Sequence, residues 1–320
     1  MENRLRSGRQ GRIHVLAFVA LSFVLAGTIL ASTTTASRPA RASGQPALGI
    51  YSEGYPQSLT DAEGATSQLG RPAQIVHWYA EWTGDMSGWA ESQPYVQKVL
   101  DAGATPMITW EAWDGANDGT NPASLQAIVR GEFDGYIDSW AQGAAALGNR
   151  PLYLRIFHEM NDPYEASDGA GYPWSVAPGN RFGNRPQDLA AAWQHIVNRF
   201  RAAGASNVRW IFNSDDDIPN NPIPAGTYPG DRYVDYVGFD AYDDSGTPFA
   251  GDYQAITRLS SRPVLIGEMG ATHAGFVQGI AAGIRSGSYP ALQALVWFDE
   301  GDTALARNPS VKAALAGLAT

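Results

Sequence analysis

Apolar segments alternate with helical patterns along most of the chain after residue 45. Several of the apolar segments are nearly continuous, which is typical of parallel strands that are buried on both faces. We therefore predict eight strands, at residues 47–52, 74–80, 105–112, 151–159, 208–214, 234–242, 263–270 and 292–300.

Helical spacing of apolar residues marks three of the segments between these strands, at 138–148, 186–204 and 273–287. The segment 186–204 gives the clearest pattern, because Leu189, Trp193, Ile196 and Phe200 fall on one face of a helix. Between the fifth and sixth predicted strands the sequence shows only a loop rich in Pro and Asn, at 218–231.

Eight strands that alternate with helices predict an α/β fold, a (β/α)8 TIM barrel in a single domain over residues 43–320. A doubly wound open sheet is the alternative architecture. Such a sheet would usually carry a glycine-rich phosphate loop after an early strand, and the sequence contains no G-x-G-x-x-G and no P-loop motif.

The first 42 residues have the pattern of an export signal. A basic stretch containing Arg4 and Arg12 precedes an apolar run from Val15 to Ala31, and Ala40-Arg41-Ala42 matches an A-x-A cleavage site. We predict a signal peptide over 1–42 and a secreted, extracellular protein. An uncleaved membrane anchor remains the alternative, because the apolar run is slightly long for a signal peptide.

Composition narrows the class of protein and of partner. Hydrophobic residues make up 44% of the chain, which argues against disorder, and the absence of cysteine means that an exported form relies on its core. Residues 1–42 hold six of the 22 basic and one of the 32 acidic residues, so the remainder has 16 and 31, a net charge of −15. This charge excludes nucleic acid as a partner and favours neutral or cationic ligands. We expect a monomer.

Carboxylates and aromatic rings gather where the predicted strands end. In a (β/α)8 barrel the active site forms at the carboxyl ends of the strands. This mixture suits sugars, because their C–H faces stack on aromatic rings and their hydroxyls bond to polar side chains. Aldolase-type Schiff-base chemistry is disfavoured, because the two lysines, Lys98 and Lys312, lie at no predicted strand end. Four further candidates for sugar binding have weaker support, and core packing is the alternative for each: His77, Trp82, Trp110 and Trp113.

Glu159 and Glu268 end the fourth and seventh predicted strands, which can lie across a barrel mouth from each other. Cleavage of a glycosidic bond needs two flanking carboxyl groups, and a separation of about 5–5.5 Å gives a retaining mechanism. The alternative is a structural pair of buried glutamates, each neutralised by an arginine such as Arg155. His158 and Glu159 would point to opposite faces of a strand, so both reach one pocket only if the strand ends or bulges there.

Several motifs resemble glycoside hydrolase family 26, best known for endo-β-1,4-mannanases. The resemblance rests on LRIFHEMN (154–161), YPW (172–174), the segment 183–214, YVDYVGFDAYD (233–243), VLIGEMG (264–270) and VWF (296–298). It covers most of residues 45–300. It implies a (β/α)8 fold, a retaining mechanism, a polysaccharide substrate and no metal or organic cofactor.

By this resemblance Glu159 is the acid/base and Glu268 the nucleophile. His158 would hold the substrate or the nucleophile, and Tyr242 would donate a hydrogen bond to the nucleophile. Trp297 would be a sugar platform after the last strand, and Trp174 the aromatic residue of the loop after the fourth strand; for both, a core position is the alternative.

The substrate that the resemblance favours is β-1,4-mannan, cleaved by endo action. The segment 162–171 is longer than in relatives and lies beside the acid/base, so mixed-linkage β-glucan and β-1,3-xylan remain alternatives. A non-catalytic carbohydrate-binding barrel is the rival class. The acidic run at 214–217 has oxygens suited to Ca²⁺, but we favour a solvated loop there.

Overall fold

The computed structural model describes residues 45–58, 69–83, 87–113, 123–162 and 171–319. These residues lie in one compact unit that extends from Gly44 to Thr320. The predicted signal peptide and most of the 162–171 segment fall outside the described residues. None of the helices in the described part has the length and apolar character needed to cross a membrane.

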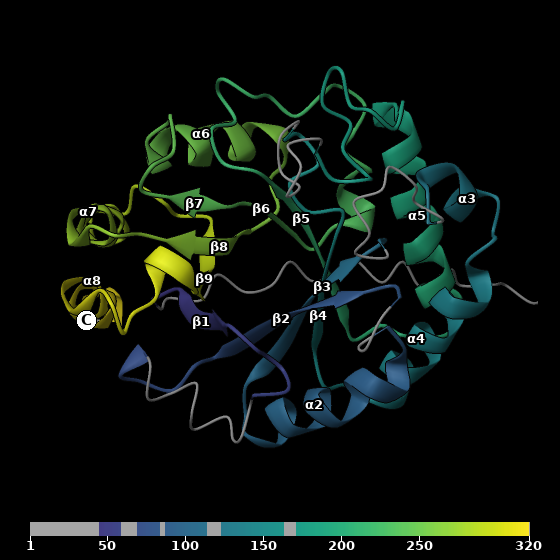
Figure 1. The fold of residues 1–320 in the computed structure, drawn as a ribbon, viewed down its shortest axis with the longest axis horizontal. Helices are drawn as coiled ribbons and strands as arrows, with labels where there is room; N and C mark the ends of the chain where they lie inside the picture. The colour runs from purple at the N-terminus through teal and green to yellow at the C-terminus, as the bar shows by residue number, and fades with distance from the viewer. Residues whose placement is uncertain (1–44, 59–68, 84–86, 114–122, 163–170, 320) are drawn as a thin grey trace, which may run out of the picture. The chain divides into compact units, whose positions relative to one another are not determined.

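A closed parallel sheet forms the centre of the molecule (Figure 1). Its strands follow one another around the barrel in sequence order. The barrel closes because β8 pairs with β6 on one side and with β9 on the other, and β9 pairs in turn with β1. The bounds are β1 (Ala47–Ser52), β2 (Ile75–Glu81), β3 (Thr105–Glu111), β4 (Leu152–Ile156), β5 (Val208–Ser214), β6 (Tyr236–Phe239), β7 (Ala241–Tyr242), β8 (Val264–Gly270) and β9 (Leu292–Asp299). The predicted (β/α)8 barrel is confirmed, with the predicted strand 234–242 interrupted at Asp240.

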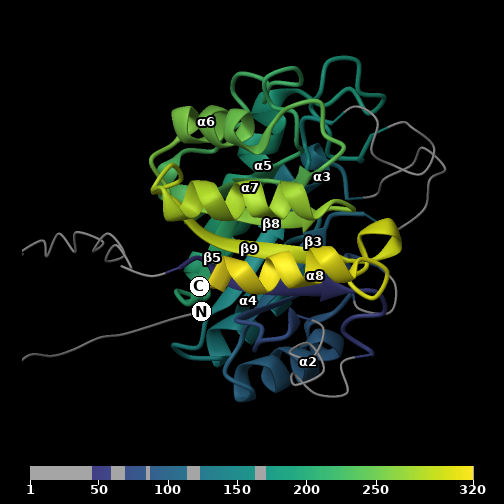
Figure 2. The ribbon, with the colours of Figure 1, turned by 90° about the vertical axis from the view of Figure 1, so that its left-hand side faces the viewer.

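Helices surround this barrel (Figure 1), and Figure 2 shows α7 and α8 running side by side along β8 and β9. Between β5 and β6 there is only a short 3-10 helix and no α-helix, as the sequence predicts. The bounds are α2 (Trp89–Asp101), α3 (Leu125–Val129), α4 (Asp134–Ala146), α5 (Pro186–Ala202), α6 (Phe249–Leu259), α7 (Ala274–Arg285) and α8 (Pro309–Ala316), with 3-10 helices η1 (Asp231–Tyr233), η2 (Gly301–Thr303) and η3 (Gly317–Ala319).

Helix α5 shows how local sequence sets an element. Pro186 occupies the first turn, where its missing N–H costs no hydrogen bond, and the Asp188 carboxylate accepts a bond from the Arg185 N–H at 3.1 Å. The apolar face then packs on the sheet, with the rings of Trp193 and Phe212 5.6 Å apart. Gly204 follows in the left-handed region at φ 79° and ends the helix.

Strand alternation divides the barrel side chains into two sets. One set faces the helices and forms the larger apolar cluster, which includes Trp78, Trp110 and Trp297. The other set fills the barrel interior, and at one level it is a small apolar cluster of Ile75, Met107, Ile211, Leu265, Ala294 and Val296. Further along β2, β3 and β4 the interior positions are polar or charged, which brings ionisable groups to the carboxyl ends of the strands.

Barrel closure needs a glycine in β6. A Cβ built on Gly238 would lie 1.9 Å from the backbone oxygen of Leu265 in β8, so any side chain at this position would push the two strands apart. Backbone atoms cannot move aside as a flexible side chain can, because the strand pairing holds them.

We predict that Gly238→Ala destabilises the protein by about 3 kcal/mol, as expected for an overpacked site in a closed barrel. Chemical denaturation followed by circular dichroism measures the change. Gly279→Ala is the matched control: Gly279 lies in α7 with nothing within 4 Å of a built Cβ, so alanine there should raise stability by about 1 kcal/mol. Equal effects of both substitutions would contradict this account of closure.

Candidate active site

Strand β4 ends at Ile156, three residues before the predicted end of this strand at 159. The reason lies in the backbone, because Phe157 and Glu159 adopt left-handed conformations with φ of 49° and 51°. Such a conformation costs about 1–3 kcal/mol for a residue other than glycine, and it occurs most often at functional sites. Phe157 packs toward α5, with its ring 6.4 Å from that of Trp193, while His158 and Glu159 both turn toward the barrel mouth.

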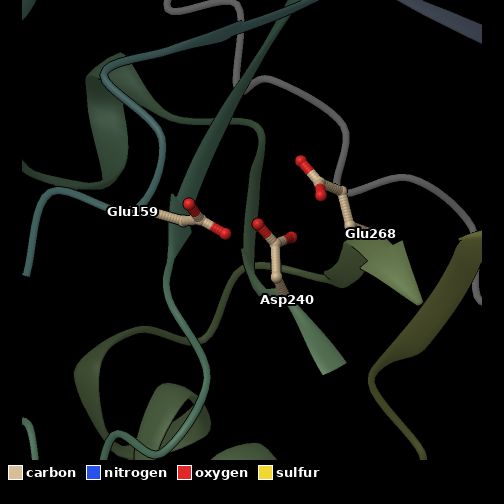
Figure 3. A group of neighbouring side chains, drawn as sticks. All are labelled: Glu159, Asp240 and Glu268. Carbon is tan, nitrogen blue, oxygen red and sulfur yellow. The ribbon is translucent and has the colours of Figure 1, made fainter. Parts of the chain in front are cut away.

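The two predicted carboxylates lie together at this mouth, with Asp240 between them (Figure 3). Glu159 and Glu268 are each 6% exposed, and carboxylate oxygens of Glu159, Asp240 and Glu268 all lie within 4.8 Å of one another. The N–H of Glu159 donates to the backbone oxygen of Asn213 at 3.0 Å, which fixes its place beside β5. The nearest oxygens of Glu159 and Glu268 therefore lie closer than the about 6.5–9.5 Å that separates the carboxyl groups of inverting glycosidases.

Glu268 accepts hydrogen bonds from three side chains. Tyr242 donates its hydroxyl to Oε2 at 2.7 Å, Tyr79 donates to Oε1 at 2.5 Å, and the Arg155 guanidinium also donates to Oε1. Hydrogen bonds of this kind stabilise the charged form of a carboxylate. Glu268 is therefore held as an anion in a fixed orientation.

Arg155 is the cation of the site and is fully buried. Its Nε donates to Thr109 Oγ1 at 2.7 Å, and its Nη1 lies 3.1 Å from both carboxylate oxygens of Asp240. Arg155 thus pairs with Glu268 and Asp240 and leaves Glu159 without a Lys or Arg partner among the described residues. The alternative of two equally neutralised glutamates does not match this geometry.

The environment of Glu159 favours its protonated form. Burial raises the pKa of Glu159 well above its usual range, and the neighbouring charges of Asp240 and Glu268 raise it further. Burial and Glu268 also raise the pKa of Asp240 to about 7, against the opposing effect of Arg155. The site therefore pairs a neutral acid, Glu159, with a hydrogen-bonded anion, Glu268.

One cluster of carboxylates at this mouth has the geometry to bind a metal ion. Glu159, Asp240 and Glu268 could supply three oxygen ligands, but the Arg155 guanidinium already pairs with Asp240 and Glu268. A divalent cation would have to share these carboxylates with a buried guanidinium. Elsewhere in the described ranges no comparable cluster occurs, and this includes the acidic run at 214–217.

Comparison with protein families agrees with this geometry. The model of "Glycosyl hydrolase family 26" matches residues 101–302, a range that holds both Glu159 and Glu268. This chain belongs to glycosyl hydrolase family 26. The family assignment and the activity class, a glycoside hydrolase, agree with the predictions from the sequence.

Two relatives show how far the sequence similarity extends. "Endoglucanase H" of Acetivibrio thermocellus is 34% identical over 249 residues, 72% of this chain and 25% of that protein. "Mannan endo-1,4-beta-mannosidase" of Bacillus subtilis is 26% identical over 177 residues, 53% of this chain and 46% of that protein. The matched regions thus span about a quarter and about half of the relatives' own lengths.

Solved structures share the fold at lower identity. The Bacillus subtilis mannanase BCman superposes with a TM-score of 0.60 at 17% identity, over 86% of this chain and 85% of that chain. A GH26A structure from a Muricauda species has a TM-score of 0.60 at 18% identity, over 84% of this chain and 88% of that chain. Both support the (β/α)8 barrel.

His158 lies inside a shell of aromatic rings in this family 26 site. Its Nε2 is 3.9 Å from a carboxylate oxygen of both Glu111 and Glu159, and its ring centre is 4.6 Å from that of Tyr172. Burial lowers the pKa of His158, so the ring is neutral. Trp174 donates its indole N–H to the His158 backbone oxygen at 2.7 Å and is itself buried under Tyr172. Its position favours a role in fixing the His158 backbone.

Three of the other predicted tryptophans do not face the mouth. Trp82 and Trp110 pack together in the layer between strands and helices, where the Trp110 ring stacks on Tyr136 of α4. Trp297 is fully buried in the same apolar cluster. The reason is alternation, because each lies next to residues whose side chains face the barrel interior.

Trp113 and His77 lie nearer the site. Trp113 is half-buried, with its ring edge-on to Tyr172 and Trp174. His77 is fully buried in the barrel interior below Tyr79, and a hydrogen bond of 2.7 Å joins its Nε2 to Thr109 Oγ1.

The structure adds residues that sequence reasoning did not select as site residues. Tyr79, Arg155 and Asp240 form the hydrogen-bonded surroundings of Glu268. Phe298 also lies at the mouth, where its ring stacks on Tyr51 at 4.7 Å. The alternation of side chains along a strand could have placed Tyr79 in the barrel interior, because it falls two positions after the interior residue His77.

Glu111 is a second buried acid beside the site. It pairs in register with Glu81 at the ends of β3 and β2. Burial raises its pKa to about 8, helped by the charges of Glu81 and Glu268 and opposed by Arg155.

We predict that Glu111 makes stability depend on pH. A carboxyl group whose pKa is raised by folding stabilises the protein below its unfolded pKa, and this contribution is lost as the pH rises toward about 8. Glu111→Gln should therefore gain stability relative to the wild type, by on the order of 2 kcal/mol between pH 5 and pH 8. Urea denaturation at both pH values measures it.

The control for this prediction is Glu132→Gln, because the Glu132 side chain is 53% exposed. Its stability relative to the wild type should stay constant between the two pH values. A constant difference for Glu111→Gln as well would show that Glu111 is ionised in the folded protein at pH 5.

Proposed function

We propose that this protein is an exported endo-β-glycanase that works by a retaining double displacement, with Glu159 as acid/base and Glu268 as nucleophile. The observation that carries the proposal is the short separation of two carboxyl groups in unlike environments. Oxygens of Glu159 and Glu268 lie within 4.8 Å, yet of these two glutamates it is Glu268 that accepts from Arg155, Tyr79 and Tyr242. Unlike environments are how two carboxyl groups take the roles of acid and nucleophile.

In the first step Glu159 protonates the oxygen of the leaving sugar while a Glu268 oxygen attacks the anomeric carbon. The glycosidic bond breaks, and a covalent ester joins the substrate to Glu268. The charge of Glu268 is then gone, and because this charge helps to raise the pKa of Glu159, that pKa falls. Glu159 can then accept a proton from the water that hydrolyses the ester.

A β-glucan is the substrate that we place first. The relative named as an endoglucanase matches at 34% identity over 249 residues, and the one named as a mannosidase at 26% over 177 residues. This order favours glucan over the mannan that the sequence motifs suggested, and mannan becomes the alternative. Export is supported by the basic and apolar pattern of residues 1–42, and a polymer substrate that cannot enter a cell agrees with it.

We predict that the protein releases reducing ends from a β-glucan faster than from β-mannan, β-1,3-xylan or β-1,4-xylan. Reducing-sugar assays on a panel that includes mixed-linkage β-glucan measure the rates. Glu268→Ala should lower kcat by at least about a thousandfold on every polymer that is cleaved, because the nucleophile is lost. A folded protein that binds these sugars without cleaving any would support the non-catalytic barrel instead.

The roles of the two glutamates predict opposite stereochemistry of rescue by azide. On an aryl β-glycoside with a good leaving group, Glu159→Ala should accumulate the covalent intermediate, and azide should then yield the β-glycosyl azide. In Glu268→Ala azide would replace the missing nucleophile and yield the α-glycosyl azide. Proton NMR distinguishes the two products, and the reverse assignment would mean that the two roles are exchanged.

A further inference from the structure

A cavity of about 770 Å³ opens beside Glu159 at the carboxyl end of the barrel. Its walls come from the segment after β4, the loop after β5 and the loop after β7. Glu159 and Tyr242 line it, whereas Glu268 does not. The cavity therefore extends away from the nucleophile, on the side of the acid/base.

The chemistry of glycoside hydrolysis indicates which part of the substrate binds on the Glu159 side of the site. The acid must be within hydrogen-bond reach of the leaving-group oxygen, whereas the nucleophile contacts the anomeric carbon of the sugar that stays bound. A cavity that includes Glu159 but not Glu268 is thus placed to hold the sugars that leave. The volume is in the range of pockets that bury small ligands, about 300–1,000 Å³.

The charge of this cavity is one-sided. Five aspartates line it beside Glu159, namely Asp162, Asp215, Asp216, Asp217 and Asp244. No Lys or Arg occurs among the described residues of its lining. Burial and neighbouring acids raise the pKa of Asp215 to about 9 and that of Asp216 to about 6, so of these two residues it is Asp216 that carries negative charge near neutral pH.

Hydrogen bonds fix the loop that carries Asp215 and Asp217. The buried Asn161 side chain donates to the Asn221 backbone oxygen at 2.8 Å and accepts from the Asp215 N–H at 2.9 Å. Asp217 accepts from Asn220 Nδ2 at 2.7 Å and from the Thr247 hydroxyl, which ties the two loops together. Because the loops are tied together, they cannot rotate away to relieve the charge repulsion with a negatively charged ligand.

We propose that this cavity is the leaving-group subsite and that it selects sugars by charge, accepting units that carry a protonated amine and rejecting units that carry a carboxylate. The proposal rests on the function proposed above, because that function defines the leaving group. A unit charge about 6 Å from an ionised carboxylate, at an effective dielectric constant of about 40, changes affinity about tenfold. The general negative charge of the chain acts less, because it is screened beyond about 10 Å.

The test is equilibrium binding of three matched β-1,4-linked trisaccharides, built from glucose, glucosamine or glucuronate. Titration calorimetry at pH 6.5 measures the binding. It uses the Glu159→Gln variant, because this substitution prevents hydrolysis and keeps a neutral side chain at the mouth. We expect the glucosamine trisaccharide to bind at least about tenfold tighter than the glucose one, and the glucuronate one at least about tenfold weaker. Both differences should shrink in 0.5 M salt, where the Debye length is only about 4 Å.

Two variants locate the effect in the cavity. Asp216→Asn and Asp244→Asn, each added to this background, should each reduce the ratio of glucosamine to glucose affinity several-fold. Asp101→Asn is the control, because Asp101 ends α2 just before β3 begins and so lies at the opposite end of the barrel. Asp101→Asn should leave the ratio unchanged.

Equal affinities for the three trisaccharides would overturn the proposal, and so would ratios that the Asp216 and Asp244 variants leave unchanged. Binding needs no turnover, so these outcomes are separate from those of the polysaccharide panel. An active enzyme without charge selection would refute the subsite proposal alone. A protein that is inactive on every polymer would refute the proposed function, and charge-selective binding by such a protein would show a charge-selective cavity that has no leaving group to hold.

Discussion

The buried guanidinium of Arg155 is the interaction on which the rest of the site depends. It reaches Thr109 in β3, Asp240 after β6 and Glu268 in β8, so one side chain of β4 links three other parts of the barrel. A buried charge is stable only with partners of opposite charge, so the strands must close in this register for Arg155 to be satisfied. A Cβ on Gly267 would lie 2.6 Å from Arg155 Nη1, which explains a glycine beside Glu268.

Arg155 also creates the difference between the two glutamates. The mouth holds one arginine and three closely spaced carboxyl groups. Asp240 and Glu268 share the guanidinium, and their negative charges make ionisation of the third group, Glu159, unfavourable. The negative charges of Asp240 and Glu268 thus favour the protonated form of Glu159. In the proposed mechanism the same neighbours would allow Glu159 to change from acid to base, because esterification of Glu268 would remove one of the charges that oppose its ionisation.

Sequence patterns predicted the fold, and they selected two glutamates that lie close together at the barrel mouth, but they gave little of what surrounds these two residues. Apolar runs locate strands because burial on both faces leaves a strong signal. The premature end of β4 could not be predicted, because nothing in the letters of Phe157 and Glu159 marks a left-handed backbone. Arg155 was visible only as a charge in an apolar run, since its partners come from strands 46 to 113 residues away.

The misplaced aromatic residues show a different limit. Trp110 and Trp297 stand at strand ends, where a sugar platform would stand, yet both face the helices. Strict alternation from the interior residues Thr109 and Val296 would have put both of them on the outer side. Position along the strand, and not residue type, decides which aromatic ring faces inward, and Phe298, one position after Trp297, lies at the mouth.

The segment from Arg155 to Asn161 connects these features. Arg155 points into the barrel and donates a hydrogen bond to Glu268, and Phe157 packs into the helix layer. Glu159 then stands at the boundary between the nucleophile and the acidic cavity, and Asn161 holds the far wall of that cavity. A regular strand would send alternate residues to opposite faces and could not aim His158 and Glu159 at one site. The two left-handed residues are what lets seven consecutive positions serve the core, the reaction centre and the leaving-group side together.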